Sequence, residues 1–310
     1  MTNMVVGIKA ITSYIPKARK SLSACLSEYH VTQEFLEKKT GYLNLARKSK
    51  EESTLDLAFN AFNKLLEQHP NLRNEIGLIV VITQNPGPTI PHISALLHGK
   101  AQLPQSVAAF DISLGCSGWV YGLSIVKSFM EANGILSGVL ITADPYSDII
   151  DSQDRNTSLI FGDAATATLF GHKEIVWDIG KFVFGTDGEF AKDLCIGTNG
   201  KLHMNGRSIF NFSLTKVPLC VKQTIENNGL ELAQIDRIIL HQAGRYMVES
   251  IGERLGCKDK TPFFANDVGN TVSSSIPLFL SANLDPKDAN IITACFGVGL
   301  SWAATFLQKR

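Results

Sequence analysis

The sequence predicts a layered α/β protein built from two similar halves. Three observations support this expectation: helix-type and strand-type segments alternate along the 310 residues, the strand-type segments are nearly continuous apolar runs, and the order of segments repeats in the second half. Nearly continuous apolar strands are typical of parallel sheets that are covered by helices on both faces. The length also suits two domains or two fused halves better than one compact core.

In the first half, residues 53–68 predict a helix, because apolar side chains recur at helical spacing from Leu55 to Leu66. The apolar run 76–83 then predicts a buried strand. A second strand is predicted at 107–113, a helix opens at Cys116, and a third strand follows at 138–143.

The second half repeats this order. A helix is predicted at 213–228 and a buried strand at 235–240. The run TPFFAND at 261–267 predicts another strand, the stretch after Asn270 a helix, and 289–296 a last strand. Cys116 and Asn270 would thus occupy equivalent turns of an N-terminal half, 1–172, and a C-terminal half, 173–310. The alternative is two ordinary doubly wound domains whose similarity is accidental.

Composition excludes several classes of protein. Lys and Arg together number 29, as do Asp and Glu, so the formal net charge is zero, which argues against an electrostatic nucleic-acid binder. The apolar runs are too short to cross a bilayer, and the N-terminus lacks the pattern of a secretory leader. The six cysteines are scattered without a C-x-x-C pair, and the histidines show no ligand spacing. We therefore expect a cytoplasmic protein with reduced thiols and no metal or membrane contact.

Three residues at strand ends suggest nucleophilic chemistry. Cys116 opens a helix, whose dipole is expected to lower the pKa of the thiol. His241 ends the strand RIILH, and the carboxyl ends of parallel strands are where α/β sheets place their chemistry. Taken singly, Cys116 is as well explained as a buried structural thiol, His241 as a hydrogen-bonded histidine at a strand end and Asn270 as a helix cap. Together they suit attack of Cys116 on a thioester and donation by His241 and Asn270 to an enolate oxygen.

The order of motifs resembles one known family, the β-ketoacyl-acyl-carrier-protein synthase III branch of the thiolase-fold condensing enzymes. The resemblance runs along nearly the whole chain and places Cys116, His241 and Asn270 on the family's catalytic triad. The matching motifs are SYIP near the start, KTGYLNLARKS at 39–49, GCSGWVYGL around Cys116, DRNTSLIFGDAATATLF at 154–170, GTDG at 185–188, HMNGRSIFNF at 203–212, HQAG at 241–244, GNTVSSSIP at 269–277 and FGVGLSW at 296–302.

The resemblance implies a five-layered αβαβα sandwich and a decarboxylative Claisen condensation. Cys116 would take an acyl group from a CoA or carrier-protein thioester, and a malonyl-type thioester would lose carbon dioxide to give an enolate held by His241 and Asn270. The backbone N–H groups of Val298 and Cys116 would form the oxyanion hole. The phosphopantetheine thioesters are substrates, and no permanently bound cofactor is implied.

The positions that the resemblance assigns to CoA depart from the family pattern. Phe35 and Lys39 stand where a stacking Trp and an Arg are common, and Gly244 replaces the Asn of the motif HQAN. Lys cannot stack as a planar guanidinium does. A carrier-protein donor or an unusual CoA ester is therefore expected rather than acetyl-CoA. Arg155 matches a nucleotide-contacting arginine or is a surface charge, and Met204 and Phe210 line a tunnel or pack in the core. The expected CoA contacts are Phe35, Lys39, Arg155, Met204, Gly206, Phe210 and Ala243.

The expected partners are an acyl carrier protein and a second copy of the chain. Segment 83–100 includes the stretch that, in the family, crosses a dimer interface. Two alternatives stay open. The protein could pass the acyl group to an amine or hydroxyl without decarboxylation, or it could be a silent subunit of a heterodimer, although such a subunit has no need of an intact triad.

Overall fold

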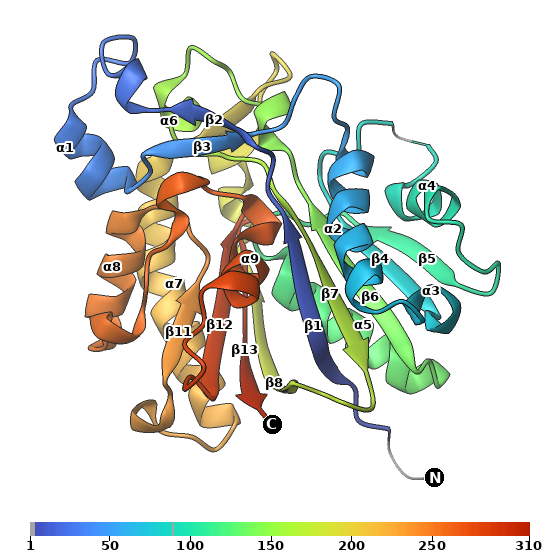
Figure 1. Ribbon diagram of the computed structural model, residues 1–310. Helices are drawn as coiled ribbons and strands as arrows, with labels where there is room; N and C mark the ends of the chain where they lie inside the picture. The colour runs from blue at the N-terminus through green and yellow to red at the C-terminus, as the bar shows by residue number, and fades with distance from the viewer. Residues whose placement is uncertain (1–3, 89) are drawn as a thin grey trace.

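The computed structural model describes residues 4–88 and 90–310, and their centre is a nine-stranded mixed sheet (Figure 1). Its strand order is β11-β12-β13-β8-β1-β7-β6-β4-β5, so the N-terminal strands form one side and the C-terminal strands the other. The strands of the N-terminal side are β1 (Gly7–Tyr14), β4 (Leu78–Ile82), β5 (Ala108–Ile112), β6 (Ser137–Ala143) and β7 (Ala165–Gly171), and those of the C-terminal side are β8 (Trp177–Thr186), β11 (Arg237–Leu240), β12 (Asn290–Gly297) and β13 (Ser301–Lys309).

The two sides of the sheet share one plan. On the N-terminal side β4 and β6 are parallel, and β7 is antiparallel to both β6 and β1. On the C-terminal side β11 and β12 are parallel, and β13 is antiparallel to both β12 and β8. A single residue pair, Ile8 with Trp177, joins the two sides. The expectation of purely parallel sheets is therefore wrong, because short connections such as the three residues between β12 and β13 can only join antiparallel strands.

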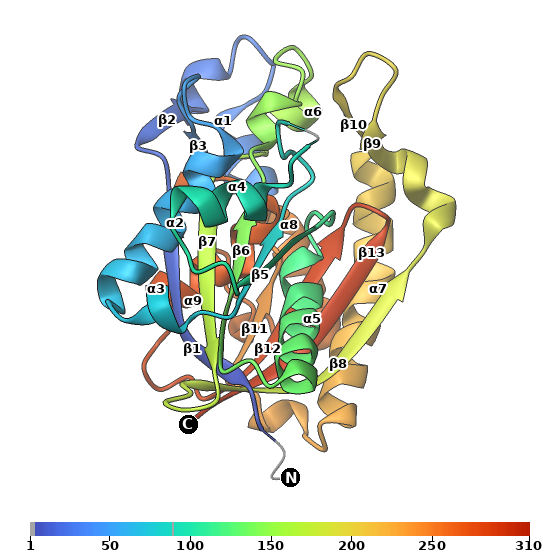
Figure 2. The ribbon, with the colours of Figure 1, turned by 90° about the vertical axis from the view of Figure 1, so that its right-hand side faces the viewer.

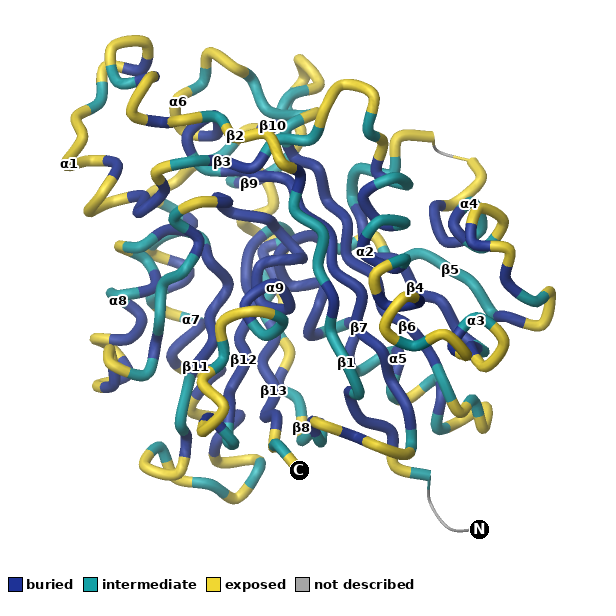
Figure 3. The backbone as a smooth tube through the Cα atoms, in the orientation of Figure 1, coloured by how far each residue is buried: buried dark blue, intermediate teal, exposed yellow. Residues whose placement is uncertain are grey.

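Helices pack on the outer face of each group of strands, and two further helices lie in the layer between the N-terminal and the C-terminal strands. α2 (Thr54–Gln68) and α4 (Ile93–Lys100) pack on N-terminal strands, and α7 (Gly206–Asn227) packs on C-terminal strands with α8 (Arg245–Leu255) against it. α5 (Gly118–Asn133) contacts strands of both sides, and α9 (Ser275–Ala282) lies against β1 and β7 (Figures 1 and 2). This gives the five-layered sandwich. Most of the central strands and the inner faces of these helices are buried, whereas β5 at the sheet edge is only partly buried (Figure 3).

Short elements complete the chain above the layers. Two small antiparallel pairs, β2 with β3 and β9 with β10, lie at the same end of the molecule as α1 and α6 (Figures 1 and 2). Their bounds are β2 (Ala18–Ser21), β3 (Asn44–Arg47), β9 (Leu194–Ile196), β10 (Leu202–Met204), α1 (Gln33–Phe35) and α6 (Arg155–Ser158). The short helix α3 (Leu72–Glu75) lies elsewhere, between α2 and β4 along the chain.

Two predicted elements of the second half differ from the structure. Segment 261–267 forms no strand and ends in a 3-10 turn at Ala265–Asp267. The side chain of Gln242 takes the place of a neighbouring strand here, since its Oε1 accepts the N–H of Phe264 at 3.0 Å and its Nε2 donates to the carbonyl of Pro262 at 3.4 Å. The helix predicted after Asn270 is divided, with a 3-10 turn at Val272–Ser274 leading into α9.

Among the described residues, no helix is both long and apolar enough to cross a membrane. The predicted boundary after residue 172 falls between β7 and β8. The division into halves 1–172 and 173–310 stays a prediction.

Candidate active site

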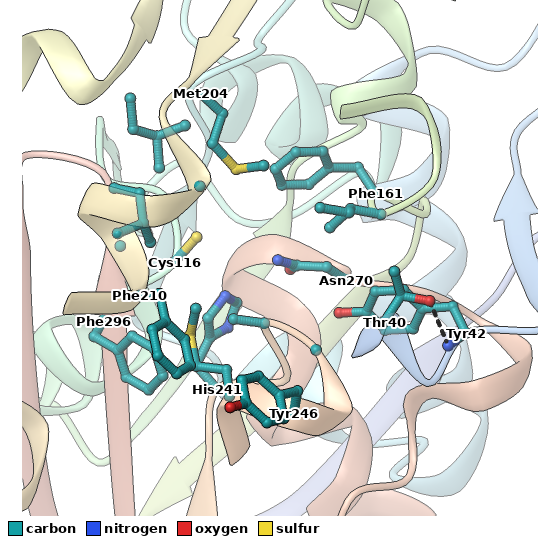
Figure 4. A pocket seen from close by; sticks show the side chains of 18 of the residues that line it. Thr40, Tyr42, Cys116, Phe161, Met204, Phe210, His241, Tyr246, Asn270 and Phe296 are labelled. Carbon is teal, nitrogen blue, oxygen red and sulfur yellow. Dashed lines mark hydrogen bonds between the residues drawn. The ribbon is translucent and has the colours of Figure 1, made fainter. Parts of the chain in front are cut away.

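Three polar side chains from different parts of the chain meet in one cavity of about 190 Å³. Cys116 lies between β5 and α5, His241 directly follows β11, and Asn270 lies in the loop before α9. Figure 4 shows all three side chains turned toward the same space. They are 4%, 1% and 4% exposed, so a substrate that reaches them is removed from bulk water.

Asn270 is oriented as a hydrogen-bond donor toward the cavity. Its Oδ1 accepts the N–H of Val272 at 2.9 Å, which leaves the Nδ2 amide group to donate. Its backbone is fixed on the N-terminal half, because its N–H donates to the carbonyl of Ile160 and its carbonyl accepts the N–H of Gly162. The position of this amide therefore depends on both halves of the molecule.

His241 is a neutral imidazole. Burial lowers its pKa from 6.5 to about 3. Its Nδ1 lies 2.7 Å from the hydroxyl oxygen of Ser275, and the ring of Phe296 contacts it edge-on at 5.5 Å between centroids. A Ser275 hydroxyl that donates to Nδ1 places the single ring proton on Nε2. The ring then has one N–H left for a substrate oxygen.

The thiol of Cys116 is protonated in the resting protein, contrary to the expectation from the helix dipole. Burial raises its pKa to about 12, and the nearby carboxylate of Asp144 adds to the rise. The backbone N–H groups of Val298 and of Cys116 itself lower the pKa without reversing that effect. Attack on a thioester therefore requires the thiol proton to leave as the bond to the carbonyl carbon forms.

The backbone around the thiol leaves room for a reacting carbonyl. The two N–H groups that favour the Cys116 thiolate, those of Val298 and Cys116, are the pair expected for an oxyanion hole. Gly297 allows β12 to approach, since a Cβ added there would lie 2.7 Å from Sγ of Cys116. The side chain of Val298 is half-buried and packs against the apolar core.

The remaining cavity wall contains most, but not all, of the predicted CoA contacts. Lys39, Met204, Gly206, Phe210 and Ala243 line it. Phe35 ends α1 with 38% of its surface exposed, and Arg155 is exposed at the start of α6, so neither lies in the wall. Sequence reasoning missed several apolar or aromatic wall residues that carry no polar motif: Tyr42, Ile160, Phe161, Leu194, Ile209, Tyr246, Met247 and Phe296.

An aromatic stack closes one side of the cavity. The rings of Phe210 and Tyr246 are parallel, with 5.3 Å between centroids and 9° between planes. The ammonium of Lys39 lies 3.5 Å from the centroid of the Tyr246 ring, within the range of a cation–π contact. Tyr246 is 44% exposed, so this stack borders the cavity opening. Lys39 thus faces an aromatic ring, a role that the sequence alone did not indicate.

Within the described ranges, no group of three or more His, Cys, Asp or Glu side chains is placed to hold a metal ion. The chemistry that the side chains themselves supply is a buried nucleophile, a neutral imidazole and an amide donor.

A layered sandwich that brings Cys116, His241 and Asn270 into one cavity is typical of a thiolase-fold, acyl-transferring enzyme. Comparison with known proteins identifies the branch. Residues 110–188 match the family model of 3-oxoacyl-[acyl-carrier-protein] synthase III, and residues 225–309 match the model of its C-terminal part. The chain belongs to the β-ketoacyl-acyl-carrier-protein synthase III family.

Full-length relatives and solved structures agree with this assignment. The chain is 30% identical to β-ketoacyl-[acyl-carrier-protein] synthase III of Staphylococcus haemolyticus, over 98% of this chain and 99% of the relative. It is 31% identical to the protein of that name from Ehrlichia chaffeensis, over 97% and 98%. The solved structure of the Thermus thermophilus synthase superposes with a TM-score of 0.89 at 29% identity, over 98% and 99% of the two chains.

Proposed function

We propose that this protein is a condensing enzyme that joins an acyl group to a malonyl-type extender held on an acyl carrier protein. Cys116 takes the acyl group from a CoA or carrier-protein thioester, and the thiol of the donor leaves with the Cys116 proton. The malonyl thioester then loses carbon dioxide, and its enolate carbon attacks the acyl-Cys116 ester. The β-ketoacyl thioester leaves, and the released Cys116 thiolate takes a proton from water to restore the thiol.

One observation carries this proposal: two neutral donors face the cavity beside the buried thiol. The Nδ2 group of Asn270 and the N–H of His241 both suit an enolate oxygen, the charge that develops as carbon dioxide leaves. Simple transfer of an acyl group to an amine or hydroxyl does not require this pair. The apolar wall further suits an uncharged acyl and pantetheine arm.

The protein also fits a cytoplasmic homodimer that receives its substrates from a carrier protein. β5 is the terminal strand of the sheet, all five of its residues are only partly buried, and Phe110 packs on Phe129 of α5 beside it. A second copy paired at this edge would cover it. Segment 83–100 lies next to β5 through α4, and its residue 89 lies outside the described residues. Size-exclusion chromatography with light scattering measures the assembly.

Mass spectrometry of the intact protein tests the reaction. Incubation with a panel of acyl-CoA and acyl-carrier-protein thioesters should add one acyl group, and Cys116→Ala should remove the adduct. Malonyl-carrier protein should then discharge the adduct as a β-ketoacyl product. His241→Ala and Asn270→Ala should keep the adduct and slow its discharge by about 100-fold or more, since each removes a donor to the developing charge.

Other results would redirect the assignment. An adduct that ignores malonyl-carrier protein but discharges to an amine or alcohol points to an acyltransferase. A protein that forms no adduct with any donor is not a condensing enzyme for these substrates.

A further inference from the structure

The loop that carries Asn270 is held in a strained turn. Val272, whose N–H fixes the Asn270 amide, has a φ of 53°, a left-handed conformation that β-branched residues rarely adopt. Such a turn is strained and persists only where the surroundings hold it. Ser273 and Ser274 follow it directly, and both are at most 1% exposed.

Ser273 ties this turn to the opposite half of the molecule. Its hydroxyl donates to Oδ2 of Asp144 at 3.1 Å, across the boundary between the C-terminal loop and the end of β6. Asp144 is itself anchored, because its Oδ1 accepts the N–H of Gln84 at 2.8 Å. Asp144 is fully buried, and it forms no ion pair with a Lys, Arg or His among the residues that the structure describes.

The same carboxylate influences the candidate nucleophile. Its negative charge raises the pKa of Cys116 and also that of Tyr146, whose hydroxyl donates to the side chain of Gln84 at 2.9 Å. The carboxylate is thus bonded to the Asn270 loop and coupled electrostatically to the thiol.

We propose that Asp144 and Ser273 act as one positioning pair, whose hydrogen bond holds the strained turn that presents the Asn270 amide. The carboxylate of the pair also provides a second readout, because its charge raises the pKa of the Cys116 thiol. The proposal rests on the function given above, and it assigns the pair to the decarboxylation step. Neither residue lines the cavity, so both act through Asn270 and Cys116 and not on the substrate.

Two measurements distinguish the effect of the hydrogen bond on decarboxylation from the effect of the Asp144 charge on the thiol. Ser273→Ala should slow release of carbon dioxide from malonyl-carrier protein by roughly tenfold, the loss expected for a hydrogen bond to a charged group, and leave the rate of Cys116 acylation unchanged. Asp144→Asn keeps the shape and removes the charge. It should speed alkylation of Cys116 by iodoacetamide at fixed alkaline pH by roughly three- to tenfold, because the thiol ionises more readily. Ser273→Ala should leave the alkylation rate unchanged.

Two further experiments test the pair: a double-mutant cycle of Asp144 and Ser273, and a control substitution of a serine that does not contact Asp144. Asp144→Ala should slow decarboxylation as Ser273→Ala does, and the double variant should be no slower than either single one. Ser281→Ala lies in helix α9, which follows the turn of Ser273, but its hydroxyl is bonded to Leu278 and Ser13, so it should leave decarboxylation unchanged. Thermal unfolding confirms that each variant is folded.

Several results would overturn the pair. These are additive losses in the double variant, equal slowing of acylation and decarboxylation by Ser273→Ala, or an alkylation rate that does not change in Asp144→Asn. Alkylation needs no substrate. An unaltered protein that releases no carbon dioxide would therefore contradict the proposed function, while the alkylation rate would still decide the role of Asp144.

Discussion

Single residues decide how closely the backbone and the reacting atoms approach each other. Gly297 ends β12 against Cys116, and an added Cβ would lie 2.6 Å from Cβ of Cys116 as well as 2.7 Å from Sγ. Real side chains do not tolerate such contacts, and neither β12 nor the start of α5 can move freely, since both are packed in the core. The residue is therefore required for the geometry around Cys116 and not only for chain flexibility.

Substitution of this glycine tests the close approach. Gly297→Ala should displace the Cys116 thiol or the Val298 N–H and lower the rate of Cys116 acylation by about 100-fold or more. Thermal unfolding should show a folded protein of lower stability. Gly188→Ala is the matched control, because no atom lies within 4 Å of a Cβ added there. Acylation at an unchanged rate in Gly297→Ala would show that the close approach does not matter.

The sequence predicts five of the nine strands of the central sheet, but it does not predict the antiparallel strands β1, β7, β8 and β13. The strands β4, β5, β6, β11 and β12 and the helices α2, α5 and α7 all fall within or overlap their predicted ranges, because their apolar patterns are set by burial on the layers.

The failure at 261–267 has a physical cause outside that segment. Its aromatic residues are typical of a strand, and they do pack, Phe263 near Tyr42 and Phe264 on Phe279. The hydrogen-bond partner of its backbone is nevertheless a side chain, that of Gln242, which no residue propensity can reveal.

The candidate site is likewise only partly predictable from the sequence. The sequence motifs predict Cys116, His241 and Asn270, whereas the burial that raises the pKa of the thiol and the Tyr246 stack arise from tertiary packing.

The opening of the cavity is built where helices α7 and α8 face the turn that carries Lys39. Phe210 comes from α7 and Tyr246 from α8, and each covers one side of the other's ring. Loss of this stack should widen the entrance without moving the thiol.

Tyr246→Ala should therefore raise KM for the acyl thioester about tenfold and leave the alkylation of Cys116 by small reagents unchanged or faster. Tyr246→Phe keeps the ring and the contact with Lys39 and should behave as the unaltered protein. Steady-state kinetics on both variants checks the expectation. Equal losses in Tyr246→Phe and Tyr246→Ala would assign the role to the hydroxyl instead of the ring.

At the scale of the whole molecule, the site exists only because the two halves are joined. Cys116 and Asp144 come from the N-terminal side of the sheet, and His241, Asn270 and Ser273 come from the C-terminal side. The β1–β8 contact is a single residue pair. The halves are joined mainly by backbone hydrogen bonds such as those of Asn270, by side-chain hydrogen bonds and by the apolar layer around α5 and α9. Two buried ionisable groups at this junction therefore link its stability to pH.

These two groups act in opposite directions. Burial raises the pKa of Asp144 from 3.8 to about 7, so the folded state binds its proton more tightly than the unfolded state does. This contribution is complete below about pH 4 and is lost as pH rises to about 7, on the order of 4 kcal/mol in all. Burial lowers the pKa of His241 from 6.5 to about 3, so its contribution is present above about pH 6.5 and is lost as pH falls to about 3.

Variants at the two positions should separate these effects. The free energy of unfolding of Asp144→Asn, minus that of the unaltered protein, should rise by a few kcal/mol between about pH 4 and pH 7, because the variant lacks the carboxyl whose proton is lost. The corresponding difference for His241→Gln should fall as pH rises from about 3 to about 6.5. Urea titrations at several pH values measure both differences. Since the contributions of Asp144 and His241 change with pH in opposite directions, together they make the stability of the unaltered protein depend little on pH. If the difference in unfolding free energy does not change with pH for either variant, neither group is buried as the structure describes.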